Sequence, residues 1–237
     1  LAAATDGTEV RDAADTTSSA DVAGRRAADV LDELAVKDVL ARRGIAVPRA
    51  VAYSPGATPA VLPFDRAVLK AVSPDVLHKS RHGLIALDIE EIGQLRAAER
   101  SILDRVAELG VSLRGLLLEE MLPAGRDLFL SISADPIGTL VALGTGGTDV
   151  EERDDVSFLG WPASDEELAA FVGRAAGLRP GAQHAHVMAL ITALADSYAR
   201  ADLTLLECNP VRLGDAGLTV LDALAFTRTG GEPMPPR

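Results

Sequence analysis

Short apolar segments of strand length alternate with longer amphipathic segments along most of this chain, and this order limits the possible folds. Helical spacing of apolar residues predicts helices at 29–44, 90–110, 164–178 and 186–201. Apolar runs bounded by turn residues predict strands at 45–54, 67–73, 84–89, 115–122, 127–135, 138–147, 203–213 and 218–226. Strands and helices mixed in this order predict an α/β (α+β) domain with two lobes.

Length and composition favour one folded domain with a short tail at each end. A chain of 237 residues, 48% of them hydrophobic, can bury one core or one core divided between two lobes. Residues 1–27 are rich in Ala, Asp, Thr and Ser and are predicted to be a flexible tail or linker. The domain is predicted at 28–230, with a smaller lobe at about 45–118, a larger lobe at about 119–230 that includes the first helix, and a tail at 231–237.

The charge balance and the single cysteine exclude several classes of protein. A net charge of -12 argues against a general nucleic-acid-binding protein, which carries a basic patch. It is compatible with a metal–nucleotide complex, which needs acidic ligands. Cys208 is the only cysteine, so no disulfide framework is possible, and a reducing, cytoplasmic setting is expected. No apolar run reaches the roughly 18 residues of a membrane-spanning helix.

A lysine-bearing strand followed by a polar loop forms the first candidate site, within residues 68–83. An apolar strand carries Lys70, and the loop after it carries His78, Lys79 and Gly83. An ammonium group and a glycine that permits close backbone approach suit nucleotide phosphates. Only Lys37, Lys70 and Lys79 among the 23 basic residues are lysine, which favours a need for compact charge at these positions. The alternative is a solvated loop in which Lys70 only marks the strand end.

A strand that ends in polar residues forms the second candidate site, within residues 115–130. The apolar strand leads into Glu119, Glu120, Met121 and Leu122, and Asp127 follows a Pro-Gly turn. Backbone groups at such a strand end can pair with a purine edge, and a carboxylate there can accept ribose hydroxyls. The alternative is an ordinary hairpin with solvated carboxylates.

The third candidate is a glycine-rich strand end followed by an acidic run. Gly144, Gly146 and Gly147 end the strand, and acidic residues follow at 149–155. This pattern is not a Gly-x-Gly-x-x-Gly that opens a helix, so it argues against a Rossmann site. It still permits close approach of a substrate. The alternative for the acidic run is a solvated face.

The fourth candidate is a set of oxygen-bearing side chains within apolar strands. Glu207 and Asn209 lie two residues apart and therefore share one face of a strand, with Leu206 and Cys208 facing the core. Asp222 follows on the strand expected to pair with it. Such groups are costly inside apolar strands unless they are paired or bind a cation, and their oxygens suit Mg²⁺. The alternative is a hairpin whose polar side chains bind local backbone groups.

Taken in order, these stretches resemble one family. The pattern is Leu-Lys-x-Val-Ser-Pro-Asp-x-x-His-Lys-Ser, Glu-Met, Gly-Arg-Asp, Asp-Pro, Gly-x-Gly-Gly, Val-Glu, Asp-Val-x-Phe, Asn-Pro and a later Leu-Asp. It is similar to the ATP-grasp domain of NDP-forming acyl-CoA synthetases, which include succinyl-CoA synthetase beta chains and ADP-forming acetyl-CoA synthetases. The resemblance covers about residues 30 to 226. It implies an ATP-grasp fold with the nucleotide held between two subdomains.

The resemblance also implies a role for each candidate residue. Lys70 would contact the phosphates of ATP or ADP, and Asp127 would lie near the ribose. His78 matches a histidine that passes a phosphoryl group toward the nucleotide. Asn209 and Asp222 would hold Mg²⁺, with Glu207 close by. The remaining residues expected at the nucleotide are Lys79, Gly83, Glu119, Glu120, Met121, Leu122, Gly146 and Gly147.

The implied activity is that of an acid–thiol ligase. Acyl-CoA, phosphate and NDP would be converted to acid, CoA and NTP, or the reverse, through phosphohistidine. The CoA-binding part and the principal phosphohistidine match nothing in this chain. A CoA-binding alpha subunit or fused domain is therefore the expected partner, in a hetero-oligomer or a longer chain, and no nucleic-acid or membrane partner is expected.

Three departures from the family pattern keep other interpretations open. The usual Ser-Asp-Val-Gly-Gly is Ser-Arg-His-Gly-Leu at 80–84, the usual Arg and Ala-Pro-Leu after Phe158 are replaced by Leu-Gly-Trp-Pro, and a loop replaces the helix expected between Tyr53 and Arg66. The first alternative is a degenerate ATP-grasp module without turnover that senses nucleotide or binds a regulatory partner. The second is a carboxylate–amine ligase, in which His78 would have no role.

Overall fold

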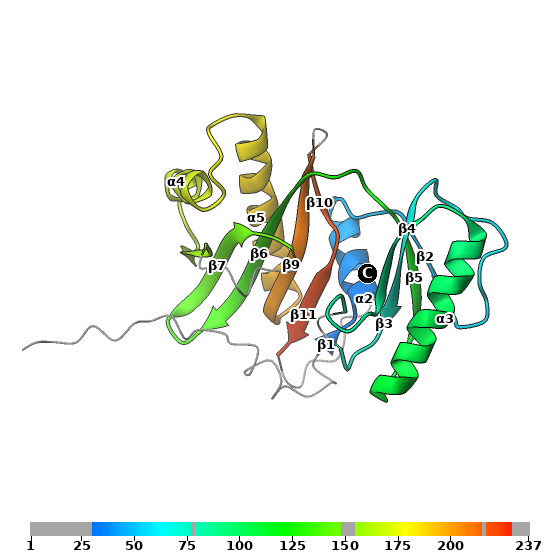
Figure 1. The fold of residues 1–237 in the computed structure, drawn as a ribbon. Coiled ribbons are helices and arrows are strands. Elements are labelled where there is room, and N and C mark those ends of the chain that lie inside the picture. The colour runs from blue at the N-terminus through cyan, green and yellow to red at the C-terminus, as the bar shows by residue number, and fades with distance from the viewer. Residues whose placement is uncertain (1–29, 77–78, 148–154, 215–216, 229–237) are drawn as a thin grey trace, which may run out of the picture.

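Two β-sheets lie side by side in the computed structural model, which describes residues 30–76, 79–147, 155–214 and 217–228 (Figure 1). The larger sheet has seven strands in the order β1-β11-β9-β6-β7-β8, with β10 paired to β9, and the smaller sheet has four in the order β2-β5-β3-β4. The chain enters the smaller sheet after helix α2 and leaves it after β5. This arrangement confirms the predicted α/β, two-lobed fold class.

The element bounds are as follows. The larger sheet contains β1 (Val30–Leu31), β6 (Arg126–Asp135), β7 (Gly138–Thr145), β8 (Ser157–Trp161), β9 (Leu203–Gly214), β10 (Gly217–Val220) and β11 (Ala223–Thr227). The smaller sheet contains β2 (Ala50–Tyr53), β3 (Ala67–Val72), β4 (Ile85–Ile89) and β5 (Gly115–Glu120). The helices are α2 (Glu33–Arg42), α3 (Ile92–Leu109), α4 (Asp165–Ala175) and α5 (Ala182–Arg200).

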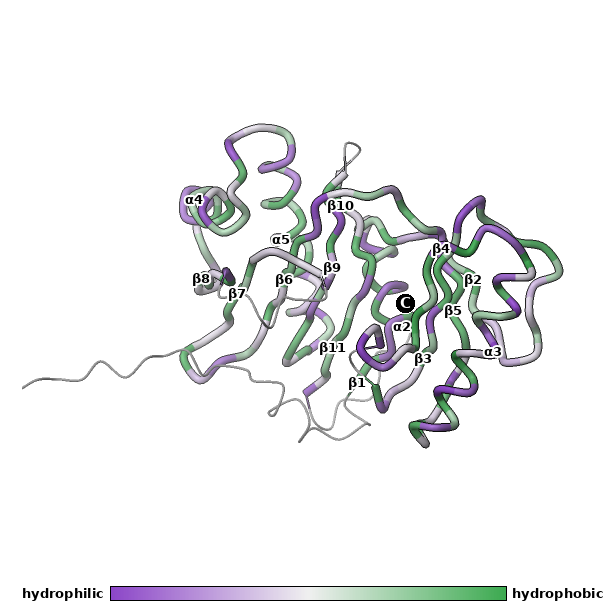
Figure 2. Tube along the Cα trace, viewed as in Figure 1, coloured by the Kyte–Doolittle hydropathy of each residue, from purple (hydrophilic) through white to green (hydrophobic). Residues whose placement is uncertain are grey.

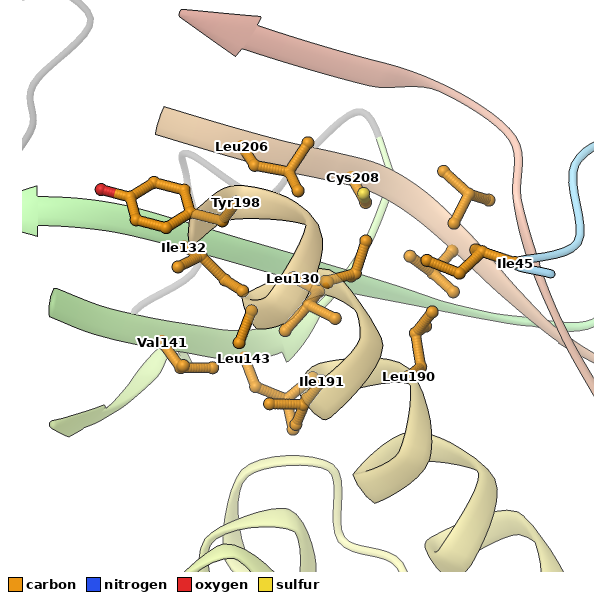
Figure 3. Packing of buried hydrophobic residues seen from close by; sticks show 14 of the residues in the cluster. Ile45, Leu130, Ile132, Val141, Leu143, Leu190, Ile191, Tyr198, Leu206 and Cys208 are labelled. Carbon is orange, nitrogen blue, oxygen red and sulfur yellow. The ribbon is translucent and has the colours of Figure 1, made fainter. Parts of the chain in front are cut away.

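The core of the larger lobe lies between its sheet and helices α2, α4 and α5. Alternate residues of β6 enter this core, among them the fully buried Leu130 and Ile132. Figure 3 shows these side chains together with Ile191 of α5 and Leu206 of β9. Because strand side chains alternate between faces, the residues between them on β6 and β9 face away from this core. The opposite face of the sheet is therefore open to the smaller lobe.

Helix α3 covers one face of the smaller sheet. Its apolar stripe, which includes Leu95 and Ile102, packs on Leu69 and Leu118 of the sheet. In Figure 2, hydrophobic and hydrophilic residues alternate along α3. The helix ends at Gly110, whose φ of 65° is the left-handed conformation that glycine adopts without strain. The predicted end of this helix is thereby confirmed. Within the described residues, no helix is both long and apolar enough to cross a lipid bilayer.

The first helix begins later than the apolar spacing predicts. Val30 and Leu31 form a short strand that pairs with β11 instead of a helical turn. Asp32 then caps α2 by accepting a hydrogen bond from the N–H of Ala35, 2.9 Å away. This later start places Glu33 in the first turn of α2.

The last predicted strand is divided in two. The sequence predicts one strand at 218–226. In the structure, β10 pairs with the C-terminal part of β9 and β11 with its N-terminal part. Leu221 and Asp222 lie between them, outside both strands. A further strand, β8, pairs with β7 and was not predicted. The predicted limits of the two lobes remain predictions, although β5 of the smaller sheet runs on to Glu120.

Gly146 holds the end of β7 against β6. A Cβ there would lie 2.4 Å from backbone atoms of Leu128, and the Gly146 N–H donates to the carbonyl of Asp127. We expect Gly146→Ala to lower the free energy of unfolding by about 2–3 kcal/mol, because the strands must separate to admit a methyl group. Urea unfolding measures this. Gly93→Ala in α3, whose added Cβ meets nothing within 4 Å, is the control. If Gly146→Ala lowers the free energy of unfolding no more than Gly93→Ala does, the expectation is contradicted.

Candidate active site

A cleft of about 710 Å³ separates the two sheets, and residues of both sheets line it. From the smaller sheet, alternate residues of β3 face the cleft, with Lys70 between Val68 and Val72. Leu69 and Ala71 point the other way, into the core under α3. The period of two in this strand therefore delivers the lysine to the cleft.

The larger sheet lines the cleft through its face away from the helices. Asp127, Phe129, Ser131 and Ser133 of β6 line it, as do Glu207 and Asn209 of β9 and the nearby Asp222. Leu206 and Cys208 face the core, as predicted. The fourth candidate set thus lines the same cleft as Lys70, and at Asp222 it comes within 3.5 Å of Lys79.

Asn209 and Asp222 come together at the break between β10 and β11. The N–H of Asn209 donates to the carbonyl of Asp222 at 3.1 Å. Asn209 Oδ1 accepts a hydrogen bond from the N–H of Gly147 at 3.0 Å. Asp222 Oδ1 accepts one from the N–H of Ala223 at 2.9 Å. Burial, together with Glu33, raises the pKa of the Asp222 carboxyl despite the nearby lysines. A cation at this carboxylate would offset that burial cost.

All three lysines of the chain meet in one buried cluster with Glu33 and Glu119. Glu33 Oε1 accepts from Lys37 at 2.6 Å and from Lys70 at 2.7 Å, and Glu33 Oε2 accepts from Lys79 at 2.6 Å. Glu119 accepts from Lys37 at 2.6 Å and from Lys70 at 2.8 Å. The carbonyl of Leu221 accepts from Lys70 at 2.8 Å. We call these five side chains the lysine cluster.

Glu33, Lys70 and Lys79 stay ionised although they are buried. Burial alone would raise the pKa of Glu33, but Lys70, Lys37 and Lys79 hold it well below its ordinary value. Burial alone would lower the pKa of Lys70, but Glu33, Asp222 and Glu119 raise it well above its ordinary value. The pKa of Lys79 is raised in the same way by Asp222 and Glu33. Lys70 and Lys79 are therefore charged at neutral pH.

The depressed pKa of Glu33 predicts a loss of stability in acid. Folding lowers this pKa, so its contribution is complete above the unfolded value, near pH 4.5, and falls as pH drops through the folded value. We expect the wild-type chain to lose more unfolding free energy than Glu33→Gln between pH 7 and pH 3, as measured by urea unfolding. Glu108→Gln, which removes an exposed carboxylate of α3 paired with Arg105, is the control. Equal losses in the wild-type and Glu33→Gln chains would contradict this expectation.

Asp127 lines the cleft as part of an ion pair. Arg212 of β9 binds both its carboxylate oxygens, with Nη2 3.1 Å from Oδ2. Arg212 Nη1 also donates to the carbonyl of Pro123 at 2.6 Å. Arg212 therefore ties the segment that joins the sheets to the larger lobe, and it fixes the carboxylate predicted for the ribose.

The structure brings most of the predicted site residues together. The cleft is lined by Lys70, Lys79, Glu119, Glu120, Met121, Leu122, Asp127, Gly147, Glu207, Asn209 and Asp222. Gly83 and Gly146 do not line it: Gly83 closes a turn at φ 67°, and Gly146 packs on Leu128. His78 lies outside the described residues. The N–H of Met121 donates to the carbonyl of Arg66 at 2.8 Å.

Sequence reasoning did not identify Glu33, Lys37 and Arg212. Glu33 and Lys37 lie far from the motifs in the chain, in a helix where a charged residue is ordinarily solvated. Arg212 follows Asn209 by three residues on β9, but nothing in the sequence marks its pairing with Asp127. The one available signal was the rarity of lysine, which marked Lys37 together with Lys70 and Lys79. This signal could not be interpreted from the sequence, because the buried partners Glu33 and Glu119 meet the lysines only in the folded chain.

The oxygen-bearing side chains of the cleft suit a partly hydrated Mg²⁺. Glu207, Asn209 and Asp222 supply carboxylate and amide oxygens, the ligand type that Mg²⁺ prefers. In the part of the chain that the structure describes, no group of three or more His, Cys, Asp or Glu side chains could hold a metal ion. Two carboxylates and one amide would leave further positions on a bound Mg²⁺ for water and phosphate.

Comparison with known proteins agrees with this geometry. The sequence profile of the ATP-grasp domain matches residues 22–225. The ADP-forming acetate–CoA ligase I of Archaeoglobus fulgidus is 32% identical over 167 residues, which are 65% of this chain and 24% of that protein. The beta subunit of the ADP-forming acetate–CoA ligase I of Pyrococcus furiosus is 33% identical over 108 residues, 44% of this chain and 47% of that protein. The chain thus spans less than half the length of either relative.

The fold is similar to that of solved structures. The dinucleotide-forming acetyl-coenzyme A synthetase 1 of Ca. Korarchaeum cryptofilum, in complex with coenzyme A, Ca-AMPCP and HgCl+, has a TM-score of 0.73 at 27% identity, over 89% of this chain and 97% of that chain. The same protein with coenzyme A and Mg-AMPPCP, its phosphohistidine segment pointing towards the nucleotide binding site, has a TM-score of 0.65 at 27% identity, over the same shares. The chain described here belongs to the ATP-grasp domain family and is similar, within it, to the ADP-forming acyl-CoA ligases.

Proposed function

We propose that this ATP-grasp domain binds a magnesium–nucleotide complex in the cleft and carries out phosphoryl transfer for an ADP-forming acyl-CoA ligase. The observation that carries the proposal is one cleft lined by Lys70 and Lys79 from the smaller lobe and by Asn209 and Asp222 from the larger lobe. A metal-bound polyphosphate requires cations and oxygen ligands in one site. The likeness to a synthetase solved with Mg-AMPPCP supports this reading.

Each wall of the cleft would have its own task. Lys70 and Lys79 would offset the charge of the transferred phosphoryl group, because they stay charged although buried. Glu207, Asn209 and Asp222 would hold Mg²⁺, which supplies charge neutralisation to the phosphates when bound. Backbone groups around Met121 and Leu122, where the chain passes between the sheets, would meet the base. The Met121 N–H would first have to leave the carbonyl of Arg66.

His78 would carry the phosphoryl group between the nucleotide and a phosphohistidine of the partner. In the direction from ATP, a neutral imidazole nitrogen attacks the γ-phosphorus, the bond from that phosphorus to the β,γ-bridging oxygen breaks, and ADP leaves with the bond pair. The phosphoryl group then passes to the partner histidine, and His78 is restored. His78 follows Asp75 and precedes Lys79 in the loop after β3, and Lys79 lines the cleft, which supports this role.

A CoA-binding subunit or fused domain would complete the enzyme. The chain spans 24% and 47% of the two relatives named above, and one of these is a beta subunit. The acyl and CoA sites would therefore lie in a separate subunit or elsewhere in a longer chain. Together the two parts would interconvert acyl-CoA, phosphate and ADP with acid, CoA and ATP.

The loss of the usual arginine after Phe158 does not weaken the cleft. Phe158 lines the cleft from β8, whereas the next residue, Leu159, packs against the core of the larger lobe. Strand alternation thus points position 159 away from the nucleotide. This departure offers no support for a degenerate module without turnover.

We expect the 237-residue chain, incubated with [γ-³²P]ATP and Mg²⁺, to acquire acid-labile phosphate on His78. The partner then removes this label when a cognate CoA-binding subunit is added. The measurement is retained radioactivity before and after acid treatment, and His78→Ala is expected to retain none. His82→Ala, four residues along the same loop, is the matched control and should be labelled. Nucleotide binding without any label would favour the regulatory interpretation, and no binding at all would exclude the proposed function.

A further inference from the structure

Lys37 shares its acceptors with Lys70: both contact Glu33 Oε1, Glu119 and the carbonyl of Leu221. Its Nζ lies 2.6 Å from Glu33 Oε1, 2.6 Å from Glu119 Oε1 and 2.5 Å from the carbonyl of Leu221. These contacts use all three ammonium protons. Its side chain is 4% exposed. Lys70 and Lys79 line the cleft, whereas Lys37 does not.

The carboxylates that Lys37 binds are those that hold the cleft lysines. Glu33 binds Lys70 and Lys79, and Glu119 binds Lys70. Both carboxylates are almost completely buried, with side-chain exposures of 1% and 3%. A buried carboxylate needs a cation at close range because water cannot replace one.

The charges of the lysine cluster do not cancel. Three ammonium groups face two carboxylates, which leaves a surplus of one positive charge. Asp222 lies next to Lys79, at 3.5 Å, and is a proposed metal ligand. Without Lys37, Glu33 and Glu119 would neutralise Lys70 and Lys79 completely. The wall of the cleft would then have no net charge to offer to an anion.

We propose that Lys37 is a positioning residue, which neutralises Glu33 and Glu119 from behind and so leaves Lys70 and Lys79 with the surplus charge that binds nucleotide phosphate. This inference rests on the proposed function. Lys37 acts through the two carboxylates and never touches the nucleotide. It reaches Glu119 of the smaller lobe from α2 of the larger lobe, so it also keeps the two walls of the cleft in register.

The experiment combines charge removal with charge restoration. Lys37→Met removes the surplus positive charge of the lysine cluster. The double variant Lys37→Met/Glu33→Gln restores this charge, because two ammonium groups then face one carboxylate. Binding of Mg-ADP is measured by calorimetry for the wild type and both variants, after circular dichroism has confirmed that each is folded. We expect Lys37→Met to bind about tenfold more weakly or worse, and the double variant to recover most of the loss.

A second measurement uses the fact that the chain has three lysines and all belong to the lysine cluster. Lysine labelled at Cε and Nζ gives one NMR signal for each, assigned by substitution. Added Mg-ADP should shift the signals of Lys70 and Lys79 more than that of Lys37. A larger shift at Lys37 would mean direct contact and would overturn the proposal. The shifts are measured on the wild-type chain, and the variants serve only to assign the signals.

The outcomes separate the inference from the proposed function. Equal Mg-ADP affinity in the wild type and Lys37→Met would overturn the role of Lys37 and leave the proposed function intact. Equal weakening in the single and double variants would show that Lys37 only stabilises the fold, which also overturns the inference. A wild-type chain that binds no Mg-ADP would overturn the proposed function, and the inference with it.

Discussion

Lys70→Met is expected to slow phosphoryl transfer from ATP to His78 by about a hundredfold to a thousandfold, the usual effect of removing a charge that faces a developing negative charge in a buried site. Lys70 stays protonated despite burial because Glu33, Asp222 and Glu119 surround it. Methionine keeps the length of the side chain and removes the charge. The measurement is the single-turnover rate of label transfer from [γ-³²P]ATP.

The same substitution also removes one cation from two buried carboxylates, so stability must be measured beside the rate. We expect the free energy of unfolding to fall by about 3–5 kcal/mol. Lys70→Arg keeps the charge and should recover part of the transfer rate. Arg200→Met removes an exposed cation paired with Asp196 and should change neither quantity. A folded Lys70→Met chain with the wild-type rate would exclude Lys70 from phosphoryl transfer.

Asp222→Asn is expected to raise the Mg²⁺ concentration needed for half-maximal nucleotide binding by about tenfold to a hundredfold. Asparagine keeps the shape and still accepts from the N–H of Ala223, but it removes the charge that attracts the cation. Because burial and Glu33 raise the pKa of Asp222, we also expect Mg²⁺ binding to weaken as pH falls toward that pKa. Nucleotide binding titrated with Mg²⁺ at fixed pH measures the first effect.

A matched surface change separates loss of a ligand from loss of charge in general. Glu108→Gln removes one exposed carboxylate on α3 that pairs with Arg105. It should leave the Mg²⁺ requirement as in the wild type. If Asp222→Asn behaves like Glu108→Gln, then Asp222 is no metal ligand and serves its contacts with Ala223 and Lys79.

The strong periodic segments made much of the fold predictable. The helix that ends at Gly110 and the helix capped by Ser164 and Glu167 carry both an apolar stripe and an end signal, and both signals act within one or two turns. The start of α2 was misplaced because Val30 and Leu31 fit a helical pattern as well as a strand. Pairing with β11, which is almost 200 residues away, decided between the two.

Some features of the cleft could likewise be predicted from the sequence, and others could not. Lys70, Asn209 and Asp222 could be proposed because apolar strands made their polarity conspicuous, and strand alternation predicted the direction of Asn209. The break between β10 and β11, which leaves Leu221 and Asp222 outside both strands, has no signature in the sequence. It arises because β9 is long enough to pair with two strands in succession.

The sequence alone was enough to predict the helices, most of the strands, the two faces of β9 and the family to which the chain belongs. These predictions depend on periodicity and on spacing, which involve residues close to one another in the sequence. Only the tertiary structure decided which charges meet. Glu33, Lys37, Lys70, Lys79 and Glu119 come from α2, from β3 and the loop after it, and from β5. Burial removes water from all five side chains at once, so each depends on the other members of the lysine cluster and on its neighbours Leu221 and Asp222.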